Sequence, residues 1–308
     1  MNARLSALIA ILILVACGQE ESTDVQSLPH PTDTPTPSPT LISPTPVPTP
    51  ETTTVQRIQW GAEPQQFGDL YLPAGVGPWP VVVMIHGGCW YSGYTLQLQH
   101  PLSQALADRD FAVWNIEYRS LGNGGDWPVM FEDVAAAADF LPRLAITASV
   151  DIDRVVAMGH SAGGHLALWL ASRQQIPTAS ALYLPSPQLI RGVITLGGIA
   201  DLTASTCGSA PMGIINGGGL SSEQLAFRLR ESSPLQMLPS GTPSVLISGA
   251  QDTIVPADIS AGYAEAATAL GDESEHLVLD GADHFYLIDP DRLDLNLIED
   301  ALTRMLQP

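Results

Sequence analysis

The segment that most constrains the fold is residues 154–170, RVVAMGHSAGGHLALWL. An apolar run typical of a buried strand breaks at small residues around a serine, and a run typical of a helix follows directly. Gly159, Gly163 and Gly164 carry no side chain, so a strand and a helix can approach each other closely at this turn. The segment therefore predicts a sharp strand-to-helix turn that presents Ser161, although an ordinary tight connection would use the same small residues.

The same alternation of strand-like and helix-like stretches continues along the chain. Strands are expected at 54–60, 67–72, 80–86, 111–118, 154–159, 191–198, 243–249 and 275–280, and helices at about 95–109, 128–145, 257–270 and 291–306 as well as directly after Ser161. This order predicts an α/β fold, with a mainly parallel sheet of about eight strands flanked by helices. In such sheets ligands bind beyond the carboxyl ends of the strands.

The N-terminus has the composition of an export signal. MNAR carries one positive charge, and the 12 mostly apolar residues that follow end at Ala16. They are too few to cross a bilayer and fit the apolar region of a signal peptide, predicted here as residues 1–16. LVACG resembles a bacterial lipobox, which implies cleavage before Cys17 and lipidation of that cysteine. We therefore expect an exported protein anchored to the cell envelope or surface, an ordinary secretory peptide being the alternative.

A second composition change separates a stalk from a globular domain. Residues 29–54 contain nine prolines and nine threonines in 26 positions. Proline removes backbone donors and almost nothing here can be buried, so no core can form. We expect a lipidated N-terminus and disordered stalk over 17–54, and a single catalytic domain over 55–308.

The charge of the chain excludes some partners. The formal net charge is -20, and all 12 basic residues are arginines. A chain so acidic has no positive surface for a phosphate backbone, so no nucleic-acid partner is expected. Anionic lipid is equally unfavourable, which leaves the lipid anchor as the expected contact with a membrane.

Five motifs together carry a family resemblance. Residues 159–163 match G-x-S-x-G between an expected strand and an expected helix, and HGGCW, NIEYR, GAQDTIVP and GADHF accompany them. Over residues 55–308 the chain resembles the α/β-hydrolase superfamily, in the esterase branch of kynurenine-formamidase-like and bacterial feruloyl and acetyl-xylan esterases. The resemblance implies a small lid insertion, placed here at 201–234, and hydrolysis of a small-molecule ester without a metal or other cofactor.

A serine nucleophile requires a base and an acid that orients the base. In this fold they follow in the order serine, acid, histidine. We expect Ser161 as nucleophile, Asp252 as acid and His284 as base, because the latter two follow the ends of expected strands. Asp201 is the reserve acid.

The oxyanion of the reaction needs donors aimed at it. Gly87 or Gly88, after the strand at 80–86, is expected to provide one N–H group, and Ala162 the other. Three more histidines near the expected site are interpreted as neutral structural residues: His86, His160 and His165.

Aromatic residues and cysteines near the same strand ends complete the predictions. Four aromatic side chains are expected either to form the substrate pocket or to be packing residues: Trp90, Tyr91, Tyr94 and Trp127. Cys89 and Cys207 either form a disulfide, as an exported protein allows, or remain two buried thiols.

The predicted function is hydrolysis of small or medium carboxylic esters through an acyl-enzyme. Hydrolysis of aryl formamides, as by kynurenine formamidases, is the alternative within enzymes. A lipoprotein that binds a solute without turnover is the alternative outside them, but a pure binder has no need for a complete, correctly ordered Ser161–Asp252–His284 set.

Overall fold

The structure is a computed structural model that describes residues 51–204 and 206–307. The predicted signal peptide, Cys17 and most of the predicted stalk lie outside the described residues. Within the described ranges, no helix has the length and apolar character needed to span a membrane.

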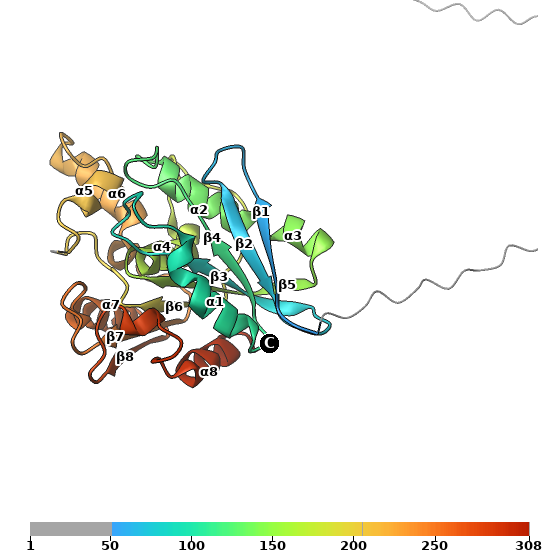
Figure 1. The fold of residues 1–308 in the computed structure, drawn as a ribbon. Coiled ribbons are helices and arrows are strands. Elements are labelled where there is room, and N and C mark those ends of the chain that lie inside the picture. The colour runs from blue at the N-terminus through green and yellow to red at the C-terminus, as the bar shows by residue number, and fades with distance from the viewer. Residues whose placement is uncertain (1–50, 205, 308) are drawn as a thin grey trace, which may run out of the picture. The chain divides into compact units, whose positions relative to one another are not determined.

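Eight strands form one sheet in the order β1-β2-β4-β3-β5-β6-β7-β8 (Figure 1). The strands are β1 (Thr54–Gln59), β2 (Phe67–Leu72), β3 (Trp79–Ile85), β4 (Ala112–Ile116), β5 (Val150–His160), β6 (Gly192–Leu196), β7 (Ser244–Gly249) and β8 (Ser274–Leu279). β2 pairs antiparallel with β1 and β4, and every other pairing is parallel. The predicted mainly parallel sheet of about eight strands is confirmed.

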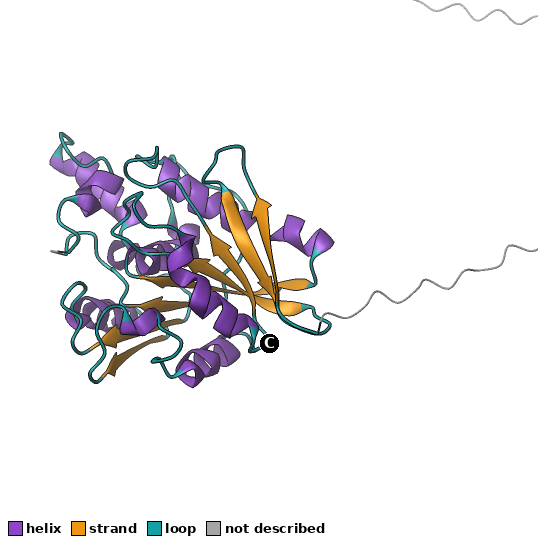
Figure 2. Cartoon of the chain, in the orientation of Figure 1, coloured by secondary structure: helices purple, strands orange, loops and turns teal. Residues whose placement is uncertain are grey.

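Helices cover both faces of this sheet (Figure 2). They are α1 (His100–Ala107), α2 (Val129–Asp139), α3 (Leu141–Thr147), α4 (Ala162–Ala171), α5 (Ala210–Ile214), α6 (Ser222–Ser232), α7 (Ala257–Ala269) and α8 (Leu295–Met305), with 3-10 turns η1 (Leu96–Gln99), η2 (Arg173–Gln175), η3 (Pro234–Met237) and η4 (Tyr286–Ile288). Alternate residues of β3 face opposite sides: Val81 and Val83 belong to the apolar cluster that includes α2, α4 and α7, whereas Val82 and Met84 belong to the cluster that includes α1 and α8. Burial on both faces explains why the central strands are predominantly apolar.

Two boundaries differ from the sequence prediction. The single helix expected at 128–145 is two helices, α2 and α3, because Pro142 has no N–H group to continue the helical hydrogen bonding. β5 begins at Val150 rather than at residue 154, because Trp79 and Pro80 of β3 also pair with Val150 and Asp151, before extra residues of β5 shift the register to Val81–Val155.

The expected lid region, 201–234, contains the short helix α5 and the helix α6. Ser221 caps α6: its side chain accepts from the amide of Gln224, and the side chain of Gln224 accepts from the amide of Ser221. This reciprocal pair satisfies two otherwise free donors and fixes where α6 begins.

Candidate active site

Ser161 occupies a strained turn between β5 and α4, at the carboxyl end of its strand. Its backbone has φ 56° and ψ -122°, a conformation that residues other than glycine rarely adopt. A Cβ at Gly159 would collide with the carbonyl oxygen of Gly163, and one at Gly163 with the carbonyl oxygen of Ile85. The glycines of the motif are therefore required by close contacts between strand and helix, and they place Ser161 at the sheet edge.

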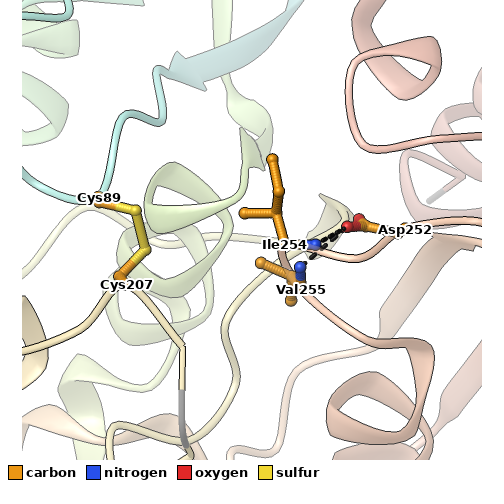
Figure 3. Close-up of a disulfide and its surroundings, with 5 residues drawn as sticks. All are labelled: Cys89, Cys207, Asp252, Ile254 and Val255. Carbon is orange, nitrogen blue, oxygen red and sulfur yellow. Dashed lines mark hydrogen bonds between the residues drawn. A yellow bond between two sulfur atoms is a disulfide. The ribbon is translucent and has the colours of Figure 1, made fainter.

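Asp252 and His284 lie on the loops after β7 and β8. Nδ1 of His284 donates to Oδ2 of Asp252 at 2.6 Å. The other carboxylate oxygen, Oδ1, accepts from the amides of Ile254 and Val255 at 2.9 and 2.8 Å (Figure 3). Burial alone would raise the pKa of Asp252, but the hydrogen bonds from His284 and the two amides together hold this pKa below its ordinary value. The carboxylate stays ionised and leaves Nε2 of His284 available as a proton acceptor.

Asp201, the reserve acid, has a different role. Its carboxylate accepts from the amide and hydroxyl of Thr203 at 2.9 and 2.7 Å and from the hydroxyl of Ser233 at 3.4 Å. These contacts cap a local turn, and the structure gives Asp201 no hydrogen bond to His284.

A cavity of about 280 Å³ brings Ser161 and His284 together. Its lining is formed by Gly88, Cys89, Tyr91, Tyr94, Leu98, His160, Ser161, Cys207, Ile254, His284 and Phe285. No aspartate, glutamate, lysine or arginine is among these lining residues. Among the described residues, no group of three or more histidines, cysteines, aspartates or glutamates is arranged to hold a metal ion.

The four predicted pocket residues divide into two pairs. Tyr91 and Tyr94 line the cavity and are 43% and 47% exposed. Trp90 is a correction: it is 1% exposed, with its ring edge to His165 at 5.3 Å between centroids. Its backbone turns at φ 59°, so its side chain is in the core rather than the cavity.

Trp127 is the second correction to the predicted pocket. Its ring packs against Phe131 at 5.4 Å between centroids, and the guanidinium of Arg228 lies 4.5 Å from its centre. It joins α2 to α6 and does not line the cavity. Residues that sequence reasoning missed as lining are Leu98, Ile254 and Phe285. The last two follow the predicted acid and base within two positions, which is the signal that would have found them.

The predicted oxyanion donors lie beside Ser161. A Cβ at Gly87 would lie 3.0 Å from the Cβ of Ser161, so the loop after β3 contacts the serine directly. Gly88 has φ 110°, and any side chain there would collide with Tyr94. Ala162 is the first residue of α4, where a backbone N–H has no partner within the helix.

Residues behind this loop hold it in place. Nδ1 of His86 donates to the carbonyl oxygen of Gly87 at 2.8 Å, and Nε2 contacts Oε1 of Glu117 at 3.0 Å. The hydroxyl of Tyr118 donates to the carbonyl oxygen of His86 at 2.9 Å. Because the N–H of a trans peptide points away from its C=O, the bond to the Gly87 carbonyl orients the N–H of Gly88.

Cys89 and Cys207 form a disulfide (Figure 3). Their Cα atoms are 5.5 Å apart, and they are separated by 118 positions in the sequence. Both line the cavity. The bond therefore joins the loop after β3 to the segment that leads into α5, and it forms part of the cavity wall.

The sheet order, the serine turn and the aspartate–histidine pair at the carboxyl edge define the chain as an α/β-hydrolase. Residues 68–266 match the family model BD-FAE, which is more than half of the 308 residues. The chain therefore belongs to the BD-FAE family.

Curated relatives include a probable isoprenylcysteine alpha-carbonyl methylesterase, ICMEL1, of Arabidopsis thaliana, 29% identical over 81% of this chain and 55% of that protein. Esterase LipC of Mycobacterium tuberculosis is 24% identical over 76% of this chain and 60% of its own length. The chain thus spans little more than half the length of the curated relatives it matches.

Solved structures share the fold at low identity. A truncated carbohydrate esterase from gut microbiota has a TM-score of 0.71 at 20% identity, covering 84% of this chain and 99% of its own. An esterase B from Lactobacillus rhamnosis, inhibited by a tributyrin phosphonate, has a TM-score of 0.70 at 22% identity, covering 84% of this chain and 87% of its own.

Proposed function

We propose that this protein is a serine esterase that hydrolyses carboxylic esters through an acyl-enzyme. The observation that carries the proposal is that one cavity is lined by Ser161 and by His284, whose Nδ1 is hydrogen-bonded to Asp252. A nucleophile and a base that share one cavity, with an acid hydrogen-bonded to the base, are the arrangement expected for such a reaction. The relatives and solved structures named above are esterases, which supports the same reaction class.

The mechanism has two halves. Oγ of Ser161 attacks the ester carbonyl carbon while Nε2 of His284 takes the hydroxyl proton, and the carbonyl oxygen becomes an oxyanion near the N–H groups of Gly88 and Ala162. The carbon–oxygen bond to the alcohol then breaks, and His284 returns the proton to the departing alkoxide. A water molecule, deprotonated by His284, then attacks the acyl carbon. The bond to Oγ of Ser161 breaks, His284 returns the proton to Oγ, and the acid is released. Asp252 stabilises His284 while it is doubly protonated.

The lining of the cavity supports neutral esters with a compact apolar group. Ile254 and Phe285, which are 42% and 50% exposed, line the cavity together with Tyr91 and Tyr94. No arginine is present among its lining residues to pair with a substrate carboxylate. Each methylene that fits such a pocket contributes ~1–3 kcal/mol of discrimination, so chain length is expected to matter.

We also propose that the protein is exported and lipid-anchored through Cys17. The support is the sequence of the N-terminus, together with the Cys89–Cys207 disulfide, since disulfides persist in oxidising compartments outside the cytosol. The Cys17→Ser variant is expected to leave the membrane fraction of a bacterial host, and an unchanged membrane fraction would disprove the anchor.

The test of the proposed reaction compares the full chain with its Ser161→Ala variant on p-nitrophenyl acetate, butyrate and octanoate and on N-formylkynurenine. Loss of a catalytic serine lowers kcat by ~10⁶, so turnover should vanish. Ser103→Ala is the matched control, because Ser103 is equally buried but lies in α1, away from the cavity. Preference for N-formylkynurenine would assign the formamidase reaction instead. No turnover by folded protein on any of the four would overturn the ester hydrolase.

A further inference from the structure

His160 is a buried titratable residue that the mechanism above does not use. It is the last residue of β5, directly before Ser161, and is 1% exposed. Its Nε2 lies 3.1 Å from the carbonyl oxygen of His284, a residue 124 positions away in sequence. A carbonyl oxygen only accepts hydrogen bonds, so Nε2 of His160 carries the hydrogen and donates it.

The ring of His160 also lies beside the rings of His284 and Phe285 and close to Gly87. Its centroid lies 4.3 Å from that of His284 and 6.0 Å from that of Phe285. On the other side, a Cβ at Gly87 would lie 3.1 Å from Nδ1 of His160. One imidazole thus fills the space between the loop of the base and the expected oxyanion loop.

This burial has a cost that an apolar side chain would avoid. Nδ1 of His160 has no hydrogen-bond partner among the described residues, and an unpaired buried acceptor is unfavourable. What the ring provides in return is a donor for the buried carbonyl of His284, which an apolar residue would leave unpaired.

The charge state of the ring suits this place. Burial, and then the nearby charge of His284, lower the pKa of His160 to about 3. The ring therefore stays neutral while His284 takes up and releases a proton during the reaction. A second positive charge at 4.3 Å would oppose that protonation, whereas a neutral donor does not.

We propose that His160 is a positioning residue: through its Nε2–H bond to the main chain of His284, it fixes the catalytic base relative to the nucleophile that follows it. The role in turnover rests on the proposed ester hydrolysis. The geometric role does not, because it concerns the His284–Asp252 hydrogen bond, which can be observed without a substrate.

Two variants at this site separate the donor from the ring. In His160→Gln the side-chain amide reaches about as far as Nε2 and keeps an N–H donor. In His160→Phe the ring remains and the donor is lost. His165→Phe is the matched control, because His165 is equally buried, donates from Nε2 to the carbonyl oxygen of Ser232 at 2.8 Å, has an unpaired Nδ1 and does not line the cavity.

The experiment measures kcat and KM on p-nitrophenyl butyrate, and the downfield proton resonance of the His284 Nδ1–H, assigned by its loss in Asp252→Asn. For His160→Phe we expect kcat to fall roughly 10- to 100-fold with KM nearly unchanged, and the resonance to broaden by exchange. His160→Gln should retain most of kcat and the resonance, and folded His165→Phe should retain both.

The proposal is overturned if folded His160→Phe keeps kcat and the resonance, if His160→Gln is as defective as His160→Phe, or if His165→Phe loses both signals equally. If His160→Phe does not fold by circular dichroism, His160→Asn replaces it, since its shorter amide does not reach the carbonyl. If the parent protein turns over no ester, the proposed function fails, and the resonance alone decides the positioning role.

Discussion

Nδ1 of His284 lies 2.6 Å from Oδ2 of Asp252, although the two residues follow different strands. The other carboxylate oxygen is held by the amides of Ile254 and Val255, so the carboxylate cannot rotate away. The turn after β7 is therefore built around the aspartate, and the imidazole of His284 is held in one tautomer, with its hydrogen on Nδ1.

The first prediction concerns that tautomer. In Asp252→Asn the side-chain oxygen can still accept from the two amides, so the NH₂ group faces Nδ1 of His284 and forces the ring hydrogen onto Nε2. His284 then cannot take the serine proton, and kcat should fall by ~10⁴ with the fold retained. Steady-state kinetics on p-nitrophenyl butyrate measure the loss. Asp201→Asn is the control and should change kcat little, since Asp201 bonds to Thr203 and Ser233 instead; equal losses in the two variants would refute the assignment of the acid.

A second prediction concerns Gly197, which packs on the same pair. Its φ is 56°, and a Cβ there would lie 3.1 Å from both Oδ2 of Asp252 and Nδ1 of His284. Gly197→Ala should therefore lower kcat by roughly tenfold, or about 1.4 kcal/mol of transition-state stabilisation, by displacing the pair. Gly241→Ala is the matched control: it has φ 72° but nothing within 4 Å of its added Cβ. The Gly241→Ala variant should lose ~1–2 kcal/mol of unfolding free energy in urea and keep its kcat. If kcat falls equally in Gly197→Ala and Gly241→Ala, the effect is due to backbone strain and not to displacement of the pair.

The fold was predictable because burial on both faces leaves a local signature. The central strands β3, β4 and β7 appear in the sequence as predominantly apolar runs, and the capping box at Ser221 is a local pattern as well. The break between α2 and α3 is indicated in the sequence by Pro142. The early start of β5 could not be predicted, because it depends on a register shift against β3, where the consecutive residues Pro80 and Val81 pair with Asp151 and Val155.

Some of the site residues could likewise be predicted from local sequence, and others could not. Ser161, Asp252 and His284 follow strand ends, so strand periodicity alone places them at one edge of the sheet. Trp90 and Tyr91 are adjacent in the sequence, yet one is 1% exposed and the other 43%. No periodicity separates them, because their environments depend on the backbone turn at Trp90 and on its contact with His165 in a distant helix.

The third prediction concerns the Cys89–Cys207 disulfide. It closes a span of 118 residues, for which the chain-entropy model gives a stabilisation of ~4–5 kcal/mol. The double variant Cys89→Ser/Cys207→Ser should lose about that much unfolding free energy in urea. Thiol titration of the unfolded, unreduced parent checks the bond independently: two reactive thiols from these positions would contradict it.

A final prediction follows from His165, whose pKa burial lowers from 6.5 to about 4. The unfolded chain takes up this proton near pH 6.5 and the folded chain only near pH 4, so between these values the unfolded state binds more protons. The contribution of His165 to the free energy of unfolding is therefore fully present above pH 6.5 and is lost as the pH falls toward 4.

Asp252 affects the stability of the protein at lower pH than His165 does. Its lowered pKa contributes stability that is present above 3.8 and lost as the pH falls through the folded value. His160, whose pKa is lowered from 6.5 to about 3, loses stability over the same interval, from pH 7.5 to 4.5. Because parent and variant share that loss, the effect of His165 is the difference between them. His165→Gln keeps a donor for the carbonyl of Ser232 but does not titrate, so its unfolding free energy should fall by roughly 2–3 kcal/mol less than that of the parent over this interval. Urea unfolding at both pH values measures the difference, and equal falls would show that His165 is not buried in its neutral form.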